Sequence, residues 1–167
     1  MMIWSPRTVD RTVSRVIYLG LCAMAVWAGS ALINYSLDTK LYKDYLLVWI
    51  VCGQRFNEKQ VPWPSFDGTN HIAYMSELVR RMRRAGITPP DSNTKVPYAY
   101  LLDRLWEKEE KIFVLLLPDR MIIYGMSRPT FEKVDNQVDG TVDLGRGRFK
   151  GKVSKDGTTI IGMWGMS

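Results

Sequence analysis

The chain has 167 residues, and because 46% of them are apolar it can form a core and is not globally disordered. Its formal net charge of +6 favours anionic partners such as lipid headgroups, nucleic acid or acidic proteins, although such a charge also keeps a protein soluble. Two cysteines, Cys22 and Cys52, and a single histidine cannot supply the four ligands of a common zinc site. We therefore predict neither a metal site nor a cofactor.

An uncharged segment near the N-terminus predicts a transmembrane anchor. Residues 16–37 form a run of 22 without a charged side chain. A helix of this length rises about 33 Å, which matches a bilayer hydrocarbon core about 30 Å thick. The basic N-terminal segment, residues 1–15, contains three arginines, whereas only Lys40 and Lys43 follow the run closely. This asymmetry predicts an inner (plasma) membrane protein that crosses once, with its N-terminus cytoplasmic and its head extracytoplasmic.

The alternatives to a retained anchor are a cleaved signal peptide, a lipoprotein and a buried soluble helix. Small residues within Trp27–Ala31 would permit cleavage, but the apolar run continues beyond them. Cleavage before Cys22 is disfavoured because Leu21 is bulky where a small residue is required. A second apolar stretch, Tyr45–Gly53, is too short to span a membrane. It predicts either a continuation of the anchor helix that packs on the head or a strand.

Residues 38–66 are predicted to form a juxtamembrane helix and connector, and residues 67–167 an α+β head. The strongest helix prediction is Asn70–Ala85, because apolar residues recur there at spacings of three and four. These apolar residues are Ile72, Met75, Leu78, Val79 and Met82. A second helix is predicted over Val96–Lys111, where Pro97 suits the first helical position.

Apolar runs in the second half of the head predict strands. The sequence KIFVLLLPDRMIIYGM, which begins at Lys111, predicts two strands around a turn at residues 118–120. Both runs are almost continuously apolar, so this hairpin should be central and buried on both faces. Residues 140–164 predict three more strands. The expected head therefore has two helices and an antiparallel β-meander of about five strands.

The tripeptide Asp-Gly-Thr occurs three times, beginning at Asp67, Asp139 and Asp156. We predict a helix N-terminus at the first copy, the start of a strand at the second and a hairpin turn at the third. A phosphatase-like nucleophile at Asp67 is disfavoured because prolines break any strand before it, and no copy has the alternating carboxylates of a calcium loop. His71 falls in the first turn of a predicted helix, where we expect a dispensable surface or boundary residue.

Two basic clusters are the candidate binding residues. The first lies toward the C-terminal end of a predicted helix, where the helix dipole favours cations, and comprises Arg80, Arg81, Arg83 and Arg84. The second alternates along one predicted strand, so that its members would share a face, and comprises Arg148, Lys150 and Lys152. Either cluster would suit an anionic surface or an acidic partner, and the alternative for both is a solvated face without a ligand.

The order of an apolar N-terminal helix, a connector, helices and then strands resembles type IV pilins and pseudopilins. In that family a leader is cut after Gly, an aromatic residue follows, and Glu stands at the fifth mature position. A cut after Gly20 in this chain would place Leu21 first and Ala25 fifth. The resemblance is therefore one of architecture, and we do not infer membership.

These observations predict a single-pass membrane-anchored subunit or assembly factor of a cell-envelope complex of the secretion, pilus or conjugation type. Such a protein would act through contacts with other subunits of a membrane complex. We predict that it is not an enzyme, because one histidine and no convergent set of acids and bases leave little for catalysis. The alternative is a basic module that binds anionic lipid, polysaccharide or DNA, although an extracytoplasmic head disfavours nucleic acid.

Overall fold

The structure is a computed structural model that describes residues 6–166. Residues 1–5 of the predicted basic segment lie outside the described residues. The chain divides into two compact units, residues 1–36 and residues 37–167, which are treated separately. Helix α1 (Pro6–Lys40) forms the first unit, and its last turn belongs to the second.

Helix α1 carries large apolar side chains that are exposed. Leu19 is 70% exposed, Trp27 75% and Leu32 70%. Among the described residues, one helical stretch, Asp10–Glu58, is long and apolar enough to cross a membrane, and its apolar window is not buried. The predicted N-terminal apolar helix is therefore confirmed, with a length and composition suited to a bilayer.

The second unit begins with a helix that changes its winding. The last turn of α1 continues through a π-helical segment, η1 (Leu41–Leu46), into α2 (Leu47–Glu58). A π-helical turn shifts which side chains share a face, and here Leu41, Tyr45 and Leu46 are all buried. The prediction that Tyr45–Gly53 continues the N-terminal apolar helix is confirmed, and the strand alternative is wrong.

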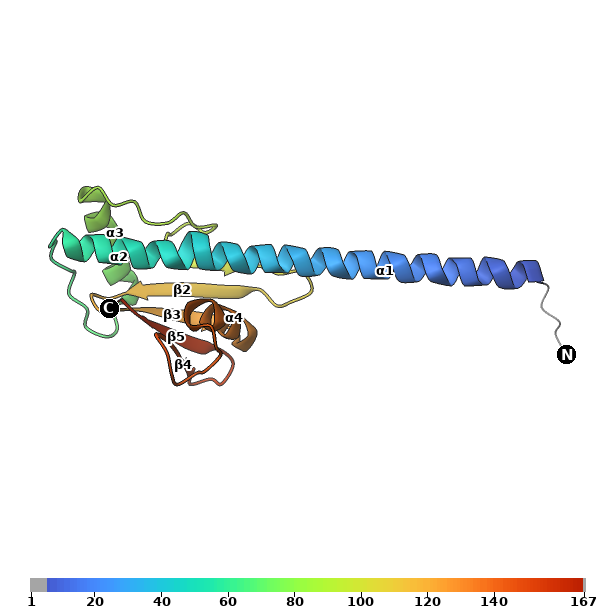
Figure 1. Ribbon diagram of the computed structural model, residues 1–167. Coiled ribbons are helices and arrows are strands. Elements are labelled where there is room, and N and C mark those ends of the chain that lie inside the picture. Colours follow the sequence, from blue (N-terminus) through green and yellow to red (C-terminus); the bar gives the residue numbers. More distant parts are fainter. Residues whose placement is uncertain (1–5, 167) are drawn as a thin grey trace. The chain divides into compact units, whose positions relative to one another are not determined.

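The rest of the second unit is an antiparallel sheet with two further helices (Figure 1). The helices are α3 (His71–Arg84) and α4 (Arg128–Asp139). The strands are β1 (Ala99–Leu102), β2 (Glu110–Leu116), β3 (Arg120–Met126), β4 (Phe149–Val153) and β5 (Ile160–Gly165). The predicted α+β class is thus confirmed. The strand order, β1-β2-β3-β5-β4, departs from a simple meander because α4 separates β3 from the β4–β5 hairpin.

Helices cover the two faces of the sheet unequally. On one face the Tyr45 ring of η1 lies 4.8 Å from that of Tyr100, and the Phe131 ring of α4 stacks on Phe149 at 4.9 Å. The opposite face carries α3, whose first residue, His71, contacts Tyr124 on β3. The hairpin β2–β3 is central, as predicted. Its expected burial on both faces is wrong in part, since Phe113, Ile122 and Tyr124 are only half-buried.

The predicted helix Val96–Lys111 is wrong. This segment forms β1, a loop and the start of β2. Its apolar residues satisfy a helical spacing, but the buried ones are Tyr98, Tyr100 and Leu102, which follow the period of two that a strand requires. A strand forms here because β1 pairs with the edge of β2, and beside this pairing Val114 N–H donates to Tyr98 O at 2.8 Å.

The second helix of the head is α4, which the sequence analysis does not predict. Its N-cap is Ser127, whose hydroxyl accepts a hydrogen bond from Thr130 N–H, and Pro129 lies in its first turn. The three strands predicted after Gly140 are two, β4 and β5, because residues 140–148 form a loop. The total of five strands is right because β1 supplies the fifth.

The three Asp-Gly-Thr copies are turns, and the second differs from its prediction. Asp67 accepts hydrogen bonds from Thr69 N–H and Asn70 N–H just before α3, as expected of a helix start. The second copy ends α4 instead of starting a strand, because Gly140 adopts the left-handed conformation (φ +74°) that closes a helix. The third copy turns the β4–β5 hairpin, as predicted, with Gly157 at φ +71°.

Helix α3 has the predicted bounds within one residue, but its buried face is rotated from the prediction. Ile72 is 67% exposed, and Tyr74 is buried in its place. His71 is half-buried at the boundary, as predicted: its Nδ1 lies 3.2 Å from Thr69 O and its Nε2 3.4 Å from the Tyr124 hydroxyl. Its dispensability stays a prediction.

A glycine at the irregularity in β3 should be the most sensitive backbone position of the sheet. Gly125 has φ +84°, and a Cβ there would overlap the carbonyl oxygen of Lys111 on β2. We expect Gly125→Ala to lower the free energy of unfolding by roughly 3 kcal/mol or more, because strain and overlap add. The control is Gly157→Ala, which has similar φ but open space around it and should cost about 1–2 kcal/mol. Equal losses in denaturant unfolding of the two full-length variants would contradict this account.

Candidate functional site

A buried cluster of charges lies where the last turn of α1, the β1–β2 loop and the start of α4 meet. At its centre is Arg104, whose side chain is only 1% exposed. Its Nε donates to Asp38 Oδ1 at 2.7 Å, its Nη1 to Glu110 Oε1 at 2.6 Å, and its Nη2 to Thr130 Oγ1 at 2.8 Å. We call these four residues, together with Ser127 and Lys133, the Arg104 clamp. Three elements far apart in sequence are thereby joined through one guanidinium group.

The outer members of the clamp complete the hydrogen bonding of its carboxylates. Lys133 Nζ donates to Asp38 Oδ2 at 2.6 Å. The backbone N–H and hydroxyl of Ser127 each donate to Glu110 at 2.8 Å. Two cations thus oppose two buried carboxylates, which offsets the cost of removing charge from water.

The clamp favours the charged form of its arginine. Burial lowers the pKa of Arg104, but the hydrogen bond and negative charge of Asp38, with those of Glu110, outweigh burial and raise it above its ordinary value. A permanently charged group with saturated carboxylate partners does not serve as an acid or base near neutral pH. The arrangement therefore holds three elements of the second unit together.

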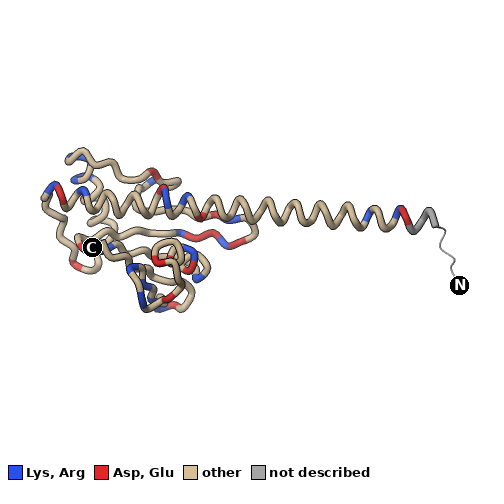
Figure 2. The backbone as a smooth tube through the Cα atoms, in the orientation of Figure 1, with Lys and Arg blue, Asp and Glu red and all other residues tan. Residues whose placement is uncertain are grey.

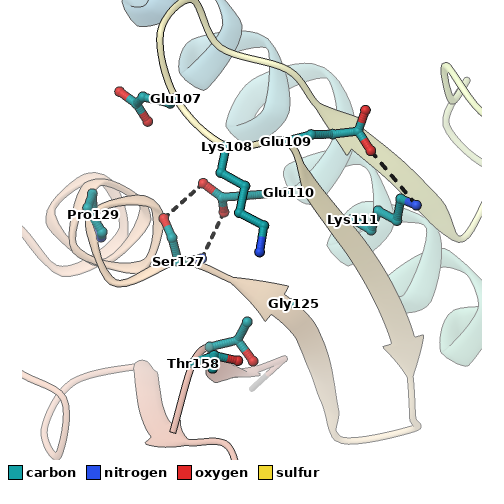
Figure 3. Close-up of a pocket in the computed structure, with 10 residues that line it drawn as sticks. Glu107, Lys108, Glu109, Glu110, Lys111, Gly125, Ser127, Pro129 and Thr158 are labelled. Carbon is teal, nitrogen blue, oxygen red and sulfur yellow. Dashed lines mark hydrogen bonds and ion pairs between the residues drawn. The ribbon is translucent and has the colours of Figure 1, made fainter. Parts of the chain in front are cut away.

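A pocket of about 620 Å³ lies beside the clamp (Figure 3). Its lining includes Gly125, Ser127 and residues 107–111, which run from the β1–β2 loop into β2, and Thr158 lies on a separate segment opposite them. Figure 3 shows Glu110 and Ser127 directed at each other. The buried carboxylate in the pocket wall, that of Glu110, therefore already accepts hydrogen bonds from Ser127. No group of three His, Cys, Asp or Glu side chains within residues 6–166 could hold a metal ion.

The arginine cluster at the end of α3 is partly engaged in local structure. Arg80 and Arg81 both pair with Glu77 one turn earlier, and Arg81 Nη1 also donates to Pro62 O at 2.7 Å. Arg83 and Arg84 are exposed. The predicted binding residues Arg80 and Arg81 thus have a structural task, and the outward charge of the cluster rests on Arg83 and Arg84.

The second basic cluster lies on the edge strand of the sheet. Lys150 and Lys152 are exposed on one face of β4, as the alternation predicts, and Arg148 directly precedes the strand. Their cross-strand neighbours on β5 are Met163 and Ile161, both half-buried. Figure 2 shows basic residues of this hairpin mixed with acidic ones from the adjoining loop. The two basic clusters lie on different elements, α3 and β4, so each is a separate candidate.

Carboxylates at the end of α4 position the start of the basic strand. Asp139 accepts hydrogen bonds from Arg148 N–H at 3.0 Å and Phe149 N–H at 2.9 Å. Burial raises the pKa of Asp139, but these hydrogen bonds outweigh it and the net pKa is lowered. Asp135, one turn earlier and fully buried, has a raised pKa because of burial and the nearby charges of Asp139 and Asp143.

Both outer edges of the sheet are occupied by the chain itself. Along β1, the Asn93 side chain accepts from Leu101 N–H at 2.9 Å and donates to Leu101 O at 2.7 Å. Along β4, Gly151 N–H donates to Leu144 O at 2.8 Å. Occupied edges disfavour pairing with a strand from another chain. Contacts with partners are therefore left to the faces, helices and loops.

The Arg104 clamp was not predicted from the sequence. The available signal is Asp38, an acidic residue directly after a run of 22 uncharged residues, which would need a cation if the fold buried it. Its partner cannot be identified from sequence, because Arg104 lies 66 residues away in a segment with helical apolar spacing.

Comparison with models of known protein families, with curated proteins and with solved structures gives no match to this chain.

Removing the centre of the clamp should strongly destabilise the second unit. We expect Arg104→Ala to lower the free energy of unfolding by about 3–5 kcal/mol, because Asp38 and Glu110 would remain buried without their cation. The control is Arg120→Ala, which removes an exposed pair with Asp119 and should change the free energy of unfolding very little, because water screens exposed charges. Denaturant unfolding of the full-length protein in detergent measures both. Similar small losses would show that the clamp does not hold the fold.

The raised pKa of Asp135 predicts a pH-dependent stability term. The folded state binds this proton more tightly than the unfolded state, so stability should fall as pH rises from the ordinary value of 3.8 through the raised pKa. Asp135→Asn should remove that decline and stabilise the protein at neutral pH, since its amide oxygen can still accept from Asp143 N–H. The control for the loss of one carboxylate is Asp103→Asn, at an exposed position. An unaltered profile of unfolding free energy in Asp135→Asn would contradict the assignment.

Proposed function

We propose that the protein is a single-pass membrane-anchored subunit or assembly factor of a cell-envelope complex of the secretion, pilus or conjugation type. It acts through contacts with other subunits, with its N-terminus in the cytoplasm and its head outside. The observation that carries the proposal is a long, uncovered apolar helix that continues directly into the core of an α+β head. Helix α2 contributes fully buried Trp49 and Phe56 to that core.

The character of the head supports a role in contacts. The Arg104 clamp has its charged groups paired, which fits a structural task. The occupied edges of the sheet favour defined partners over open-ended strand pairing. Exposed basic residues on α3 and β4 then offer two surfaces for acidic partners: Arg83 with Arg84, and Lys150 with Lys152.

A second candidate function is that of a basic module for anionic lipid, polysaccharide or DNA. The observation that favours it is the shared face of Lys150 and Lys152 beside half-buried Met163 and Ile161. A cationic strand face with apolar neighbours can bind a polyanion. Retention on heparin with a steep dependence on salt would favour this function over the first.

Charge reversal at the two basic surfaces tests the proposed assembly. We expect Arg83→Glu with Arg84→Glu, or Lys150→Glu with Lys152→Glu, to remove the full-length tagged protein from large assemblies extracted from its native membrane in mild detergent. An acidic partner would be repelled by the new charges, while melting temperature should change little at exposed sites.

The matched control is Arg55→Glu with Lys95→Glu, which changes the net charge equally at exposed positions on α2 and in a loop. It should leave assembly intact. The measurement is the sedimentation of the extracted protein together with the identity of the subunits that co-purify. If both basic pairs behave like the control, neither surface carries the contacts.

A further inference from the structure

The loop between β1 and β2 exposes an apolar tip next to the buried clamp. Trp106 is 86% exposed and Leu105 41%, although both directly follow Arg104, whose side chain is almost fully buried. A tryptophan is rarely left this open on a soluble surface, because burying it removes a large apolar area from water. The tip is therefore a candidate contact surface that the clamp and the basic clusters do not explain.

The backbone of the tip is held in a conformation that presents the side chain. Trp106 has φ +66°, one of two positive values among the non-glycine residues that the structure describes. Such a conformation is unfavourable for a bulky residue and persists where the surroundings impose it. Here Arg104 is fixed on one side of the tip and Glu110 on the other, since both belong to the clamp.

The clamp also holds the tip close to the residue at which the predicted span ends. Arg104 binds Asp38, and Asp38 directly follows the predicted span, residues 16–37. The tip begins one residue after Arg104, so it is tied to the level at which the span ends. Tryptophan and tyrosine are enriched at this level of a bilayer, where an apolar ring meets polar headgroups.

We propose that Leu105 and Trp106 insert into the lipid headgroup region beside the end of the span. The proposal rests on the proposed function insofar as it requires residues 16–37 to be a retained membrane anchor. The ligand is the lipid surface itself, bound by burial of the indole ring and the leucine side chain. The clamp supplies the rigid support, and its Asp38 directly follows the last residue of the predicted span.

The charges around the tip indicate which lipids suffice. Glu107 and Glu109 flank Lys108, and all three are exposed, so the loop brings no net positive charge to the surface. Attraction to anionic lipid therefore contributes little, and insertion is driven by apolar burial. The contact should form equally well in zwitterionic bilayers and in bilayers that contain anionic lipid.

The test places an environment-sensitive fluorophore at the tip of the full-length chain in lipid nanodiscs. Cys22→Ala and Cys52→Ala remove the native thiols, and Leu105→Cys accepts the label while Trp106 is retained. The matched control carries the label through Asp156→Cys, at the exposed turn of the β4–β5 hairpin. A third protein combines Leu105→Cys with Trp106→Ser. Quenching by nitroxide-labelled lipid and by aqueous iodide is measured in zwitterionic discs and in discs with anionic lipid.

The proposal predicts that lipid nitroxide quenches the label at position 105 several-fold more than the label at position 156, and that iodide shows the opposite order. Trp106→Ser should weaken lipid quenching, and the result should be the same in both kinds of disc. Iodide quenching at position 105 equal to that at position 156 would overturn insertion, as would lipid quenching confined to anionic discs. If the chain enters the discs but iodide reaches the label at position 105, tip insertion is wrong and the membrane anchor is still supported. If the chain does not enter the discs at all, both the anchor and the tip insertion are wrong.

Discussion

The second unit depends on one desolvated guanidinium group. Arg104 holds Asp38 from the end of α1, Glu110 from β2 and Thr130 from α4 at hydrogen-bonding distance. A buried arginine is costly unless its donors meet carboxylates in good geometry, and here the carboxylates of Asp38, Glu107 and Glu110 and the hydroxyl of Thr130 accept from it. The same contact ties the chain directly after the apolar helix to both the sheet and the helix that covers it. Apolar packing alone is not directional, so this network specifies which elements meet.

The surfaces that remain define how such a head can meet other molecules. Asn93 and the segment around Leu144 occupy the two edges of the sheet, which protects the strands from adding foreign ones. Helices cover one face, and α3 covers part of the other, leaving Ile122, Ile161 and Met163 half-buried. Contacts then fall to exposed charges and to the β1–β2 loop. These are the surfaces that the proposed contacts with partners and a membrane would use.

Sequence patterns predicted the elements whose period is strong and local. The uncharged run, helix α3, the β2–β3 hairpin and the Asp156 turn each follow from a few neighbouring residues. The pattern failed where tertiary pairing overrode a short apolar spacing, as in β1, and where a helix such as α4 has few apolar residues beyond Phe131 and Val134. Of the candidate site, the shared face of Lys150 and Lys152 was predictable from alternation. The clamp was not, because only the fold brings Asp38 and Arg104 together.

The most direct test of the central claim is the topology of the native protein. Cells that express the full-length chain with a tag at each end are fractionated. In a second sample, the outer layers of the cell envelope are permeabilised while the inner membrane stays sealed, and protease is added. The account predicts that the intact chain stays with the membrane after carbonate extraction, that the C-terminal tag and head are digested from outside, and that the N-terminal tag is protected. Recovery of the chain in the soluble fraction, or protection of the head with digestion of the N-terminal tag, would contradict it.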